Sequence, residues 1–450
     1  MPKGAVMHRL RLASALLLIV GVLGGASAQP SAVAVTVNVT LDGQPADALV
    51  LALQNDEVVS WSYTDVHAPG IAQLELTPGD YTLRVDRGVG FTSTPQTLDL
   101  TVEDASVELS VSLSRTLEPN AEGYYGVDLH THTAASAPAM ERDFGIADHG
   151  VTPVDQAVGV QLAADLDAVF ISDHNSVGGH ATFAETATER GVPYLLSEEI
   201  TTLRWGHFNV YALDSGQLVP FEFGKPPGAY FEEAHAAGAS MVQVNHPLYS
   251  NGGYWFNRSK ADYDANFDAA EALNGGFGAD DAESIRQLHR FWNDGRRYVA
   301  TASSDDHDWN DDHRGVDSRY GTPRTYVHVD GVLTAEALLD ALAKGQAFLT
   351  YGPLVYLASA DGALPGDTIR ATGAVTLEAR VASVQALDGL RAEWIADGER
   401  VAQTKLRDRR EELTREIDPT GANWVLLRLV DASGHVRAMT NPLWINPSSP

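Results

Sequence analysis

Residues 126–133 read GVDLHTHT, a short apolar strand that runs directly into two histidines two positions apart. In an extended chain, residues i and i+2 point to the same face, so the imidazoles of His130 and His132 can reach one metal ion. Exposed histidines at strand ends are common, and this pair alone does not establish a metal site. Its meaning depends on which residues come directly after the other apolar strands of the chain.

Strand-like and helix-like segments alternate through the middle of the chain. The expected strands are 126–129, 168–171, 194–196, 208–213, 241–244, 267–273 and 298–302, and the expected helices are 153–166, 179–190, 230–237, 282–293 and 334–344. Alternation at this spacing predicts parallel strands joined by helices, as in a β/α barrel. We therefore expect an α/β barrel domain over residues 122–354.

Histidine and carboxylate side chains come directly after five of these strands. They are His130, His132, Asp173, His174, Glu198, Glu199, His246, Asp305 and His307. A β/α barrel gathers the carboxyl ends of its strands at one rim, where the active sites of such barrels lie. Each group alone has an ordinary explanation, such as a helix N-cap or a solvated acidic pair. Together they predict a centre of divalent metal ions, because such centres are built from convergent ligands.

Both flanks of the barrel region alternate between apolar and polar residues with period two, which is typical of strands with one buried face. The alternation is clear at 33–41 and 107–113, and Asp397-Gly398 signals a hairpin in the C-terminal part. We expect a β-sandwich on each side of the barrel, over residues 29–118 and 355–450. The segment PGDYTLRV at 78–85 resembles the transthyretin-like regulatory sandwich modules also found in carboxypeptidases.

The first 28 residues show the three parts of a secretory signal. Basic residues precede an apolar run at 12–23, and Ala26-Ser27-Ala28 is typical of a cleavage site. The chain has no cysteine, and 60 acidic against 31 basic residues give a net charge of −29. This composition excludes disulfides and thiol catalysis, and it disfavours nucleic acid and anionic membranes as partners. We expect a secreted or periplasmic protein whose partners are small molecules, with no membrane contact after signal cleavage.

Six motifs in order along the chain resemble the polymerase and histidinol phosphatase (PHP) superfamily. They are GVDLHTHT, SDHN at 172–175, SEEIT at 197–201, WGHFNV at 205–210, NHP at 245–247 and SSDDH at 303–307. The GHFNV and SDHN forms are similar to the carbaryl-hydrolase (CehA/McbA) branch. The resemblance implies a distorted (β/α)7 barrel with two or three divalent metal ions. The mixture of histidine and carboxylate ligands suits Zn, Mn or Fe.

The resemblance also implies which residues hold each ion. The first ion would be held by His130, His132, Glu199 and Asp305, the second by Glu199, His207 and His246, and the third by His174 and His307. The remaining ligand of the third ion stays open between Asp148, His149 and a vacant position. Glu199 is preferred to Glu198 because the ligand of the family directly precedes an Ile-Ser/Thr pair, as Glu199 does here.

Two ions that share Glu199 would lower the pKa of a water between them and supply a bridging hydroxide. Asp173 is expected to accept a hydrogen bond from His174 and fix its tautomer. His180 is a candidate acid for the leaving group, or else an exposed residue of its helix. The expected function is therefore a metal-dependent phosphoesterase. A carboxylester or carbamate hydrolase is the alternative, and an inactive metal- or carbohydrate-binding protein is the interpretation from another class.

Two features bear on the substrate and leave alternatives open. The aromatic loop YSNGGYWF at 249–256 is either a lid over the pocket or an anchor to a sandwich domain. The cations Arg204, Arg258, Lys260 and Arg324 favour an anionic phosphoester if they face the metal ions. If they pair with surface acids instead, a neutral ester or carbamate is favoured.

Overall fold

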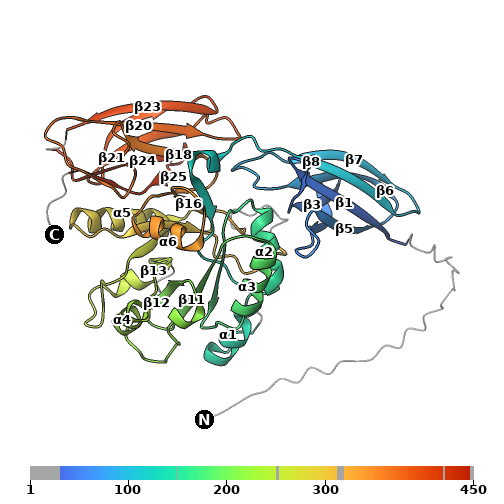
Figure 1. Cartoon of the computed structure of the whole chain (residues 1–450), viewed down its shortest axis with the longest axis horizontal. Helices are drawn as coiled ribbons and strands as arrows, with labels where there is room; N and C mark the ends of the chain where they lie inside the picture. The colour runs from blue at the N-terminus through green and yellow to red at the C-terminus, as the bar shows by residue number, and fades with distance from the viewer. Residues whose placement is uncertain (1–30, 148, 250–252, 312–318, 419–420, 446–450) are drawn as a thin grey trace, which may run out of the picture.

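The computed structural model of the chain describes residues 31–147, 149–249, 253–311, 319–418 and 421–445 (Figure 1). The predicted signal peptide, Asp148 and residues 250–252 of the predicted aromatic loop lie outside the described residues. None of the helices in the described parts has the length and apolar character that a membrane span requires.

The N-terminal strands form two four-stranded sheets that share one core. One sheet contains β1 (Val33–Leu41), β2 (Gln44–Pro45), β5 (Ile71–Leu76) and β8 (Val107–Leu113), and the other contains β3 (Leu49–Gln54), β4 (Glu57–Tyr63), β6 (Gly79–Asp86) and β7 (Gln96–Val102). Val35, Val37 and Val39 of β1 are buried against inward residues of the second sheet, such as Val50. The period-two pattern thus places one face of each strand in a common core.

The central region is built on a curled six-stranded sheet. Its strands, in sheet order, are β10 (Val169–His174), β11 (Tyr194–Thr202), β12 (Gly206–Ala212), β13 (Met241–Asn245), β14 (Ala269–Asn274) and β15 (Val299–Ser303). The helices of this region are α1 (Ala137–Phe144), α2 (Val154–Ala163), α3 (His180–Glu189), α4 (Pro227–Ala237), α5 (Ala279–Asn293) and α6 (Ala335–Ala343), and they surround the sheet in Figure 1. Short 3-10 helices cover Pro119–Glu122, Ser215–Gln217 and Tyr254–Asn257.

The strand directions in this sheet differ from the all-parallel prediction. β12 is antiparallel to both β11 and β13, whereas the other neighbours in the sheet are parallel. Only residues 203–205 connect β11 to β12, too few for the crossover that parallel strands need. The irregular segment 128–133 lies between the ends of β10 and β15, where Thr131 bridges to Asp306 and accepts a 3.0 Å hydrogen bond from the Ser172 N–H. The structure shows a curled half-barrel sheet, and a full (β/α)7 barrel is not confirmed.

The C-terminal strands continue a sheet that begins in the central region. That nine-stranded sheet contains β9 (Tyr124–Val127), β16 (Arg324–His328), β17 (Ala347–Thr350), β19 (Thr368–Ile369), β21 (Arg391–Ala396), β22 (Glu399–Lys405), β24 (Trp424–Val430), β25 (Val436–Thr440) and β26 (Leu443–Ile445). β18 (Leu354–Ser359), β20 (Val375–Ala382) and β23 (Arg410–Ile417) form a second sheet that packs on it. Because β17 pairs with both β16 and β25, hydrogen bonding continues across the predicted boundary at residue 354.

A buried carboxylate ties the N-terminal sheets to the central region. Asp165 comes shortly after α2 and is 4% exposed. It accepts hydrogen bonds from the guanidinium of Arg115 and the hydroxyl of Thr92, and it forms an ion pair with Arg87. Burial acts to raise the pKa of Asp165, but the two guanidinium groups outweigh it and hold the pKa well below its usual range. The N-terminal sheets are therefore attached by a charged contact that excludes water.

Candidate metal centre

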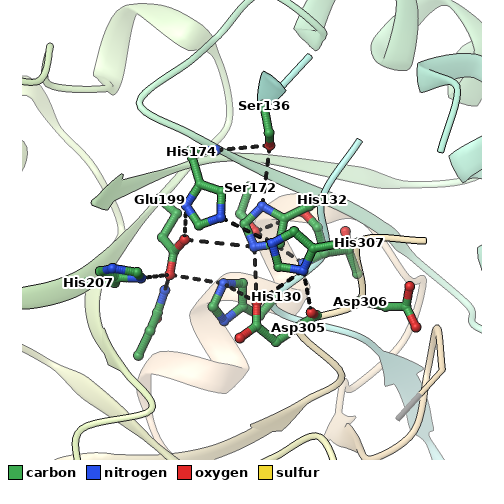
Figure 2. A network of polar contacts seen from close by, with 12 residues as sticks. His130, His132, Ser136, Ser172, His174, Glu199, His207, Asp305, Asp306 and His307 are labelled. Atoms are coloured by element: carbon green, nitrogen blue, oxygen red, sulfur yellow. Dashed lines mark hydrogen bonds and ion pairs between the residues drawn. The ribbon is translucent and has the colours of Figure 1, made fainter. Parts of the chain in front are cut away.

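Histidine and carboxylate side chains from several strand ends meet at one edge of the curled sheet (Figure 2). Four sets of three residues each bring ligand atoms within 4.8 Å of one another. These sets are His130, His132 and Glu199; His130, His246 and Asp305; His174, Glu199 and His207; and His132, His174 and His307. The sets share members, so they form one continuous cluster that could hold metal ions.

Glu199 lies in the middle of this cluster, with His207 on one side and His130 on the other (Figure 2). Its Oε1 is 3.1 Å from His130 Nε2 and 3.1 Å from His207 Nδ1. The same oxygen is 3.4 Å from His246 Nε2, while Oε2 is 2.5 Å from His174 Nδ1. Burial acts to raise the pKa of Glu199, but the surrounding histidines outweigh it and hold the pKa well below its usual value. His132 Nε2 also lies 3.7 Å from Oε2, so one ionised carboxylate faces five imidazoles, as a bridging ligand would.

The surroundings of His130 test whether a cation fits this site. Its Nε2 is 3.1 Å from Glu199 and 3.1 Å from Asp305, yet it forms no hydrogen bond within the described part of the chain. Burial acts to lower the pKa of His130, but Asp305, Glu271 and Glu199 together raise it well above its usual value. A positive charge is therefore favoured at this nitrogen, as a proton or as a metal ion. The donor set of imidazoles and carboxylates fits a divalent transition metal.

A second part of the cluster consists of histidines alone, here called the outer histidine group: His132, His149, His174 and His307. His174 Nε2 is 2.9 Å from His149 Nε2 and 3.1 Å from His307 Nε2. Burial lowers the pKa of His132 and His149, and it lowers the pKa of His307 to about 4. These three rings are neutral at pH 7, which is the form that binds metals. The His149 ring thus lies beside those of His174 and His307, the two residues expected to hold a third ion.

Polar groups behind the cluster fix the orientation of its rings. The Glu271 carboxylate, on β14, is 2.9 Å from His130 Nδ1 and also accepts from the His246 N–H at 2.6 Å. The Asn245 amide donates to Glu199 Oε1 at 2.9 Å. Glu271 was not among the predicted site residues, although an acidic residue inside the apolar strand 267–273 was a usable signal. A carboxylate is almost never fully buried unless it is paired.

The predicted role of Asp173 is wrong. Its carboxylate makes no hydrogen bond to the His174 ring and accepts instead from the Thr133 N–H at 2.7 Å and hydroxyl at 2.8 Å, and from the Ser136 hydroxyl at 2.7 Å. Burial raises the pKa of Asp173 to about 6. β10 continues through His174, so neighbouring side chains point to opposite faces. Asp173 therefore holds the turn that comes after His132.

The predicted role of His180 is also wrong. The residue begins α3 and is 3% exposed. Its Nδ1 is 2.8 Å from the Ser215 hydroxyl, and its Nε2 is 3.1 Å from the Ser197 carbonyl oxygen. Because both ring nitrogens are used away from the cluster, His180 is not placed to protonate a leaving group.

In the described part of the aromatic loop, Tyr254 and Trp255 do not form a lid, whereas the exposed Tyr249 ring lies 5.7 Å from the His246 ring. Tyr254 and Trp255 are 0% and 1% exposed, and they belong to a core that also contains residues of the C-terminal strands, such as Trp424. The Trp255 ring contacts Phe291 of α5 at 5.3 Å between centroids, and the Tyr254 ring contacts Phe208 of β12 at 5.0 Å. These aromatic rings therefore contribute to the core and not to the surface of the metal centre.

The four cations singled out in the sequence have two different environments. Arg324 is buried and donates to the carbonyl oxygens of Gly321 and Ala164, so it has a structural role. Arg204 and Lys260 lie over the Trp205 ring at 5.3 Å and 5.2 Å, beside the connection that leads to His207. They form no ion pair within the described part of the chain, and the same holds for Arg258.

Comparisons with known proteins give no family for this chain. No family model and no curated protein matches it. Among solved structures, an amidohydrolase from Chromobacterium violaceum is 16% identical, with a TM-score of 0.29 over 40% of this chain and 87% of that one. A protein of Bifidobacterium adolescentis described as a metal-dependent phosphoesterase is 16% identical, with a TM-score of 0.30 over 48% and 95%. At these TM-scores, neither likeness establishes a shared fold.

Proposed function

We propose that this chain is a secreted or periplasmic phosphoesterase that depends on divalent metal ions and is related to the PHP superfamily. The observation that carries the proposal is Glu199, a fully buried carboxylate whose two oxygens face five imidazoles. Such a carboxylate would be shared between two ions. The motif order read from the sequence supports the same superfamily.

Different residues of the chain would hold the different ions of the centre. His130, His132 and Asp305 would hold one ion together with Glu199, and His207 and His246 would hold the second. The outer histidine group would hold a third ion. Zn, Mn or Fe ions in these positions would activate water and neutralise charge on the group under attack. Glu271 would keep the His130 ring turned so that Nε2 faces the two carboxylates, a role that outer partners of metal ligands commonly have.

The choice of a phosphoester rests on the cations near the rim. A chain with a net charge of −29 repels anions unless local cations attract them. Arg204, on the connection before His207, and Lys260, over the Trp205 ring of the same connection, supply such charge, and the side chain of His207 is 27% exposed. Neither cation forms an ion pair with an acidic residue in the described part of the chain. An anionic phosphoester is therefore favoured over a neutral carboxylester or carbamate.

The test combines elemental analysis with hydrolysis assays on the mature protein. Purified protein should contain about two or three transition-metal equivalents. It should cleave p-nitrophenyl phosphate or its bis-phosphodiester faster than p-nitrophenyl acetate, and a chelator should abolish the activity. Glu199→Gln should lose both metal and turnover. Glu185→Gln, an exposed change of the same type on α3, serves as the matched control.

Three results would contradict the proposal. A folded protein that stays metal-free and inert after addition of Zn, Mn or Fe would exclude a metal-dependent hydrolase. Faster cleavage of the acetate would replace the phosphoesterase with a carboxylester hydrolase. Full activity in Glu199→Gln would show that the reaction does not use this centre. Secretion is checked separately, by N-terminal sequencing of the exported protein, which should begin at Gln29.

A further inference from the structure

A second pocket lies beside β11, outside the metal centre. Its volume is about 420 Å³, which is within the range of small-molecule sites. The residues that matter for its chemistry are Arg142, Asp143, Asn175, Glu198, Phe221 and Phe223. None of them belongs to the metal centre. Glu198 is the neighbour of Glu199 on β11, and successive strand residues point to opposite faces of the sheet.

The Glu198 carboxyl is the unusual feature of this pocket. The residue is 3% exposed, and it lines the pocket wall. Its carboxyl forms neither a hydrogen bond nor an ion pair within the described part of the chain. A buried carboxylate is unfavourable unless it is paired. Other buried carboxylates of the chain follow this rule, since Asp165 has three partners. The Glu198 carboxyl therefore lacks a hydrogen-bonding partner. A molecule bound in the pocket can supply one.

The one cation among these lining residues is already engaged. Arg142 donates to both carboxylate oxygens of Asp143, from Nε at 2.7 Å and from Nη2 at 2.7 Å. This two-point geometry fixes the guanidinium on Asp143. Arg142 is thus occupied by Asp143, which leaves the Glu198 carboxyl as a group of the pocket that no donor satisfies in the described part of the chain. This favours an occupant that brings hydrogen-bond donors, and an ammonium group carries three.

The remaining wall is aromatic. The Phe221 and Phe223 rings are 4.9 Å apart, and Phe144 of α1 lies 6.1 Å and 6.2 Å from them. Phe223 is 64% exposed, so a large apolar face is open to solvent at the pocket. Aromatic rings in this arrangement bind apolar bodies and also attract cations to their faces.

We propose that this pocket binds a primary amine carried on an aromatic or aliphatic body. The ammonium group would donate hydrogen bonds to Glu198, and the body would lie against Phe221 and Phe223. The inference is independent of the proposed hydrolase activity, because it concerns residues outside the metal centre and is tested by binding alone. The occupant would lie close to the metal centre, since Glu198 neighbours Glu199 and Asn175 neighbours His174.

The test measures binding of 2-phenylethylamine to the metal-loaded protein by isothermal titration calorimetry, with 2-phenylethanol as the uncharged control. Wild-type protein and the exposed control Glu185→Gln should bind the amine and not the alcohol. Glu198→Gln keeps the shape of the side chain and removes its charge, so amine binding should weaken about tenfold or more. Phe223→Ala should weaken it as well, and its exposed position makes it a safe second variant if Glu198→Gln does not fold.

Several outcomes would overturn the proposal. One is no binding of the amine to wild-type protein, and another is equal binding of amine and alcohol. Equal amine affinity in wild type and in folded Glu198→Gln would also exclude the pocket. Loss of binding on chelation, with full affinity kept in Glu198→Gln, would place the amine on the metal ions instead. Equal affinity in wild type and Phe223→Ala would show that the aromatic wall takes no part.

Discussion

Replacement of Asp165 by asparagine tests how the N-terminal sheets are held to the central region. The carboxylate is fully buried and meets Arg115 Nη2 at 2.6 Å, Arg87 Nη2 at 2.8 Å and the Thr92 hydroxyl at 2.6 Å. All three partners come from the N-terminal part. Asp165 has a φ of 60°, a left-handed conformation that asparagine tolerates well, so the change leaves the backbone unstrained.

The loss of unfolding free energy depends on the groups that stay buried after the substitution. The asparagine side chain would keep one acceptor oxygen, but the two guanidinium groups would lose their shared anion in a buried place. Removing one partner of a buried ion pair costs about 3–5 kcal/mol. The exposed pair between Glu122 and Arg380 has the same two-point geometry with side chains 43% and 51% exposed. Glu122→Gln should therefore cost less than about 1 kcal/mol.

The pH dependence of the unfolding free energy gives a further test of this prediction, with a definite direction. The folded pKa of Asp165 is below its unfolded value of about 3.9, so ionised Asp165 stabilises the fold above that pH. The stabilisation is lost progressively as the pH falls toward the folded pKa. Urea denaturation followed by tryptophan fluorescence should show the full difference between wild type and Asp165→Asn at neutral pH and a smaller one below about pH 4. A difference that is small at neutral pH, or that does not change on acidification, would refute the reasoning.

Three further predictions concern the centre and its surroundings. Glu271→Gln should weaken metal binding about 10- to 100-fold in titrations of metal-free protein, because His130 loses its anionic partner, and unchanged affinity would contradict this role. Trp255→Ala should cost about 3–5 kcal/mol of unfolding free energy and leave the ratio of bulky to small ester turnover unchanged. A changed ratio with an unaltered melting temperature would instead support a lid. His149→Ala should lose one metal equivalent by elemental analysis, and equal metal content would show that His149 binds no ion.

Much of the central sheet could be predicted because its strands are short apolar runs with helical segments between them. The same pattern predicted the pair Glu198-Glu199 after the run 194–196, and the choice of Glu199 within the pair came from the resemblance to the PHP superfamily. The strand directions could not be predicted in this way. The expected strands 194–196 and 208–213 left a connection of eleven residues, whereas β11 and β12 extend so far that only residues 203–205 join them. β9 was expected in the curled sheet, whereas it pairs with β16.

The wrong prediction for Asp173 has a simple physical cause. Residues that are adjacent in the sequence need not have adjacent side chains in space. Asp173 and His174 lie on one strand and point to opposite faces, so they cannot pair through their side chains. The position of the His149 ring could not be predicted for a different reason. The sequence of the segment before it shows no strand or helix pattern that would place the ring. Its position depends on the tertiary structure, in which its Nε2 meets that of His174 at 2.9 Å.

The alternation of side chains along a strand also explains how β11 can serve two sites. Glu199 turns toward the imidazoles and Glu198 toward the aromatic pocket, so one strand carries both carboxylates in opposite directions. The two carboxylates differ in their surroundings, since Glu199 faces five histidines and the Glu198 carboxyl has no partner in the described part of the chain. Burial raises the pKa of Glu198 to about 8, while the histidines hold that of Glu199 well below its usual value. A cation bound beside Glu198 would lower its pKa again, just as the histidines do for Glu199. The partners of each side chain, and not the identity of the residue, therefore decide which acid of the pair is ionised at neutral pH.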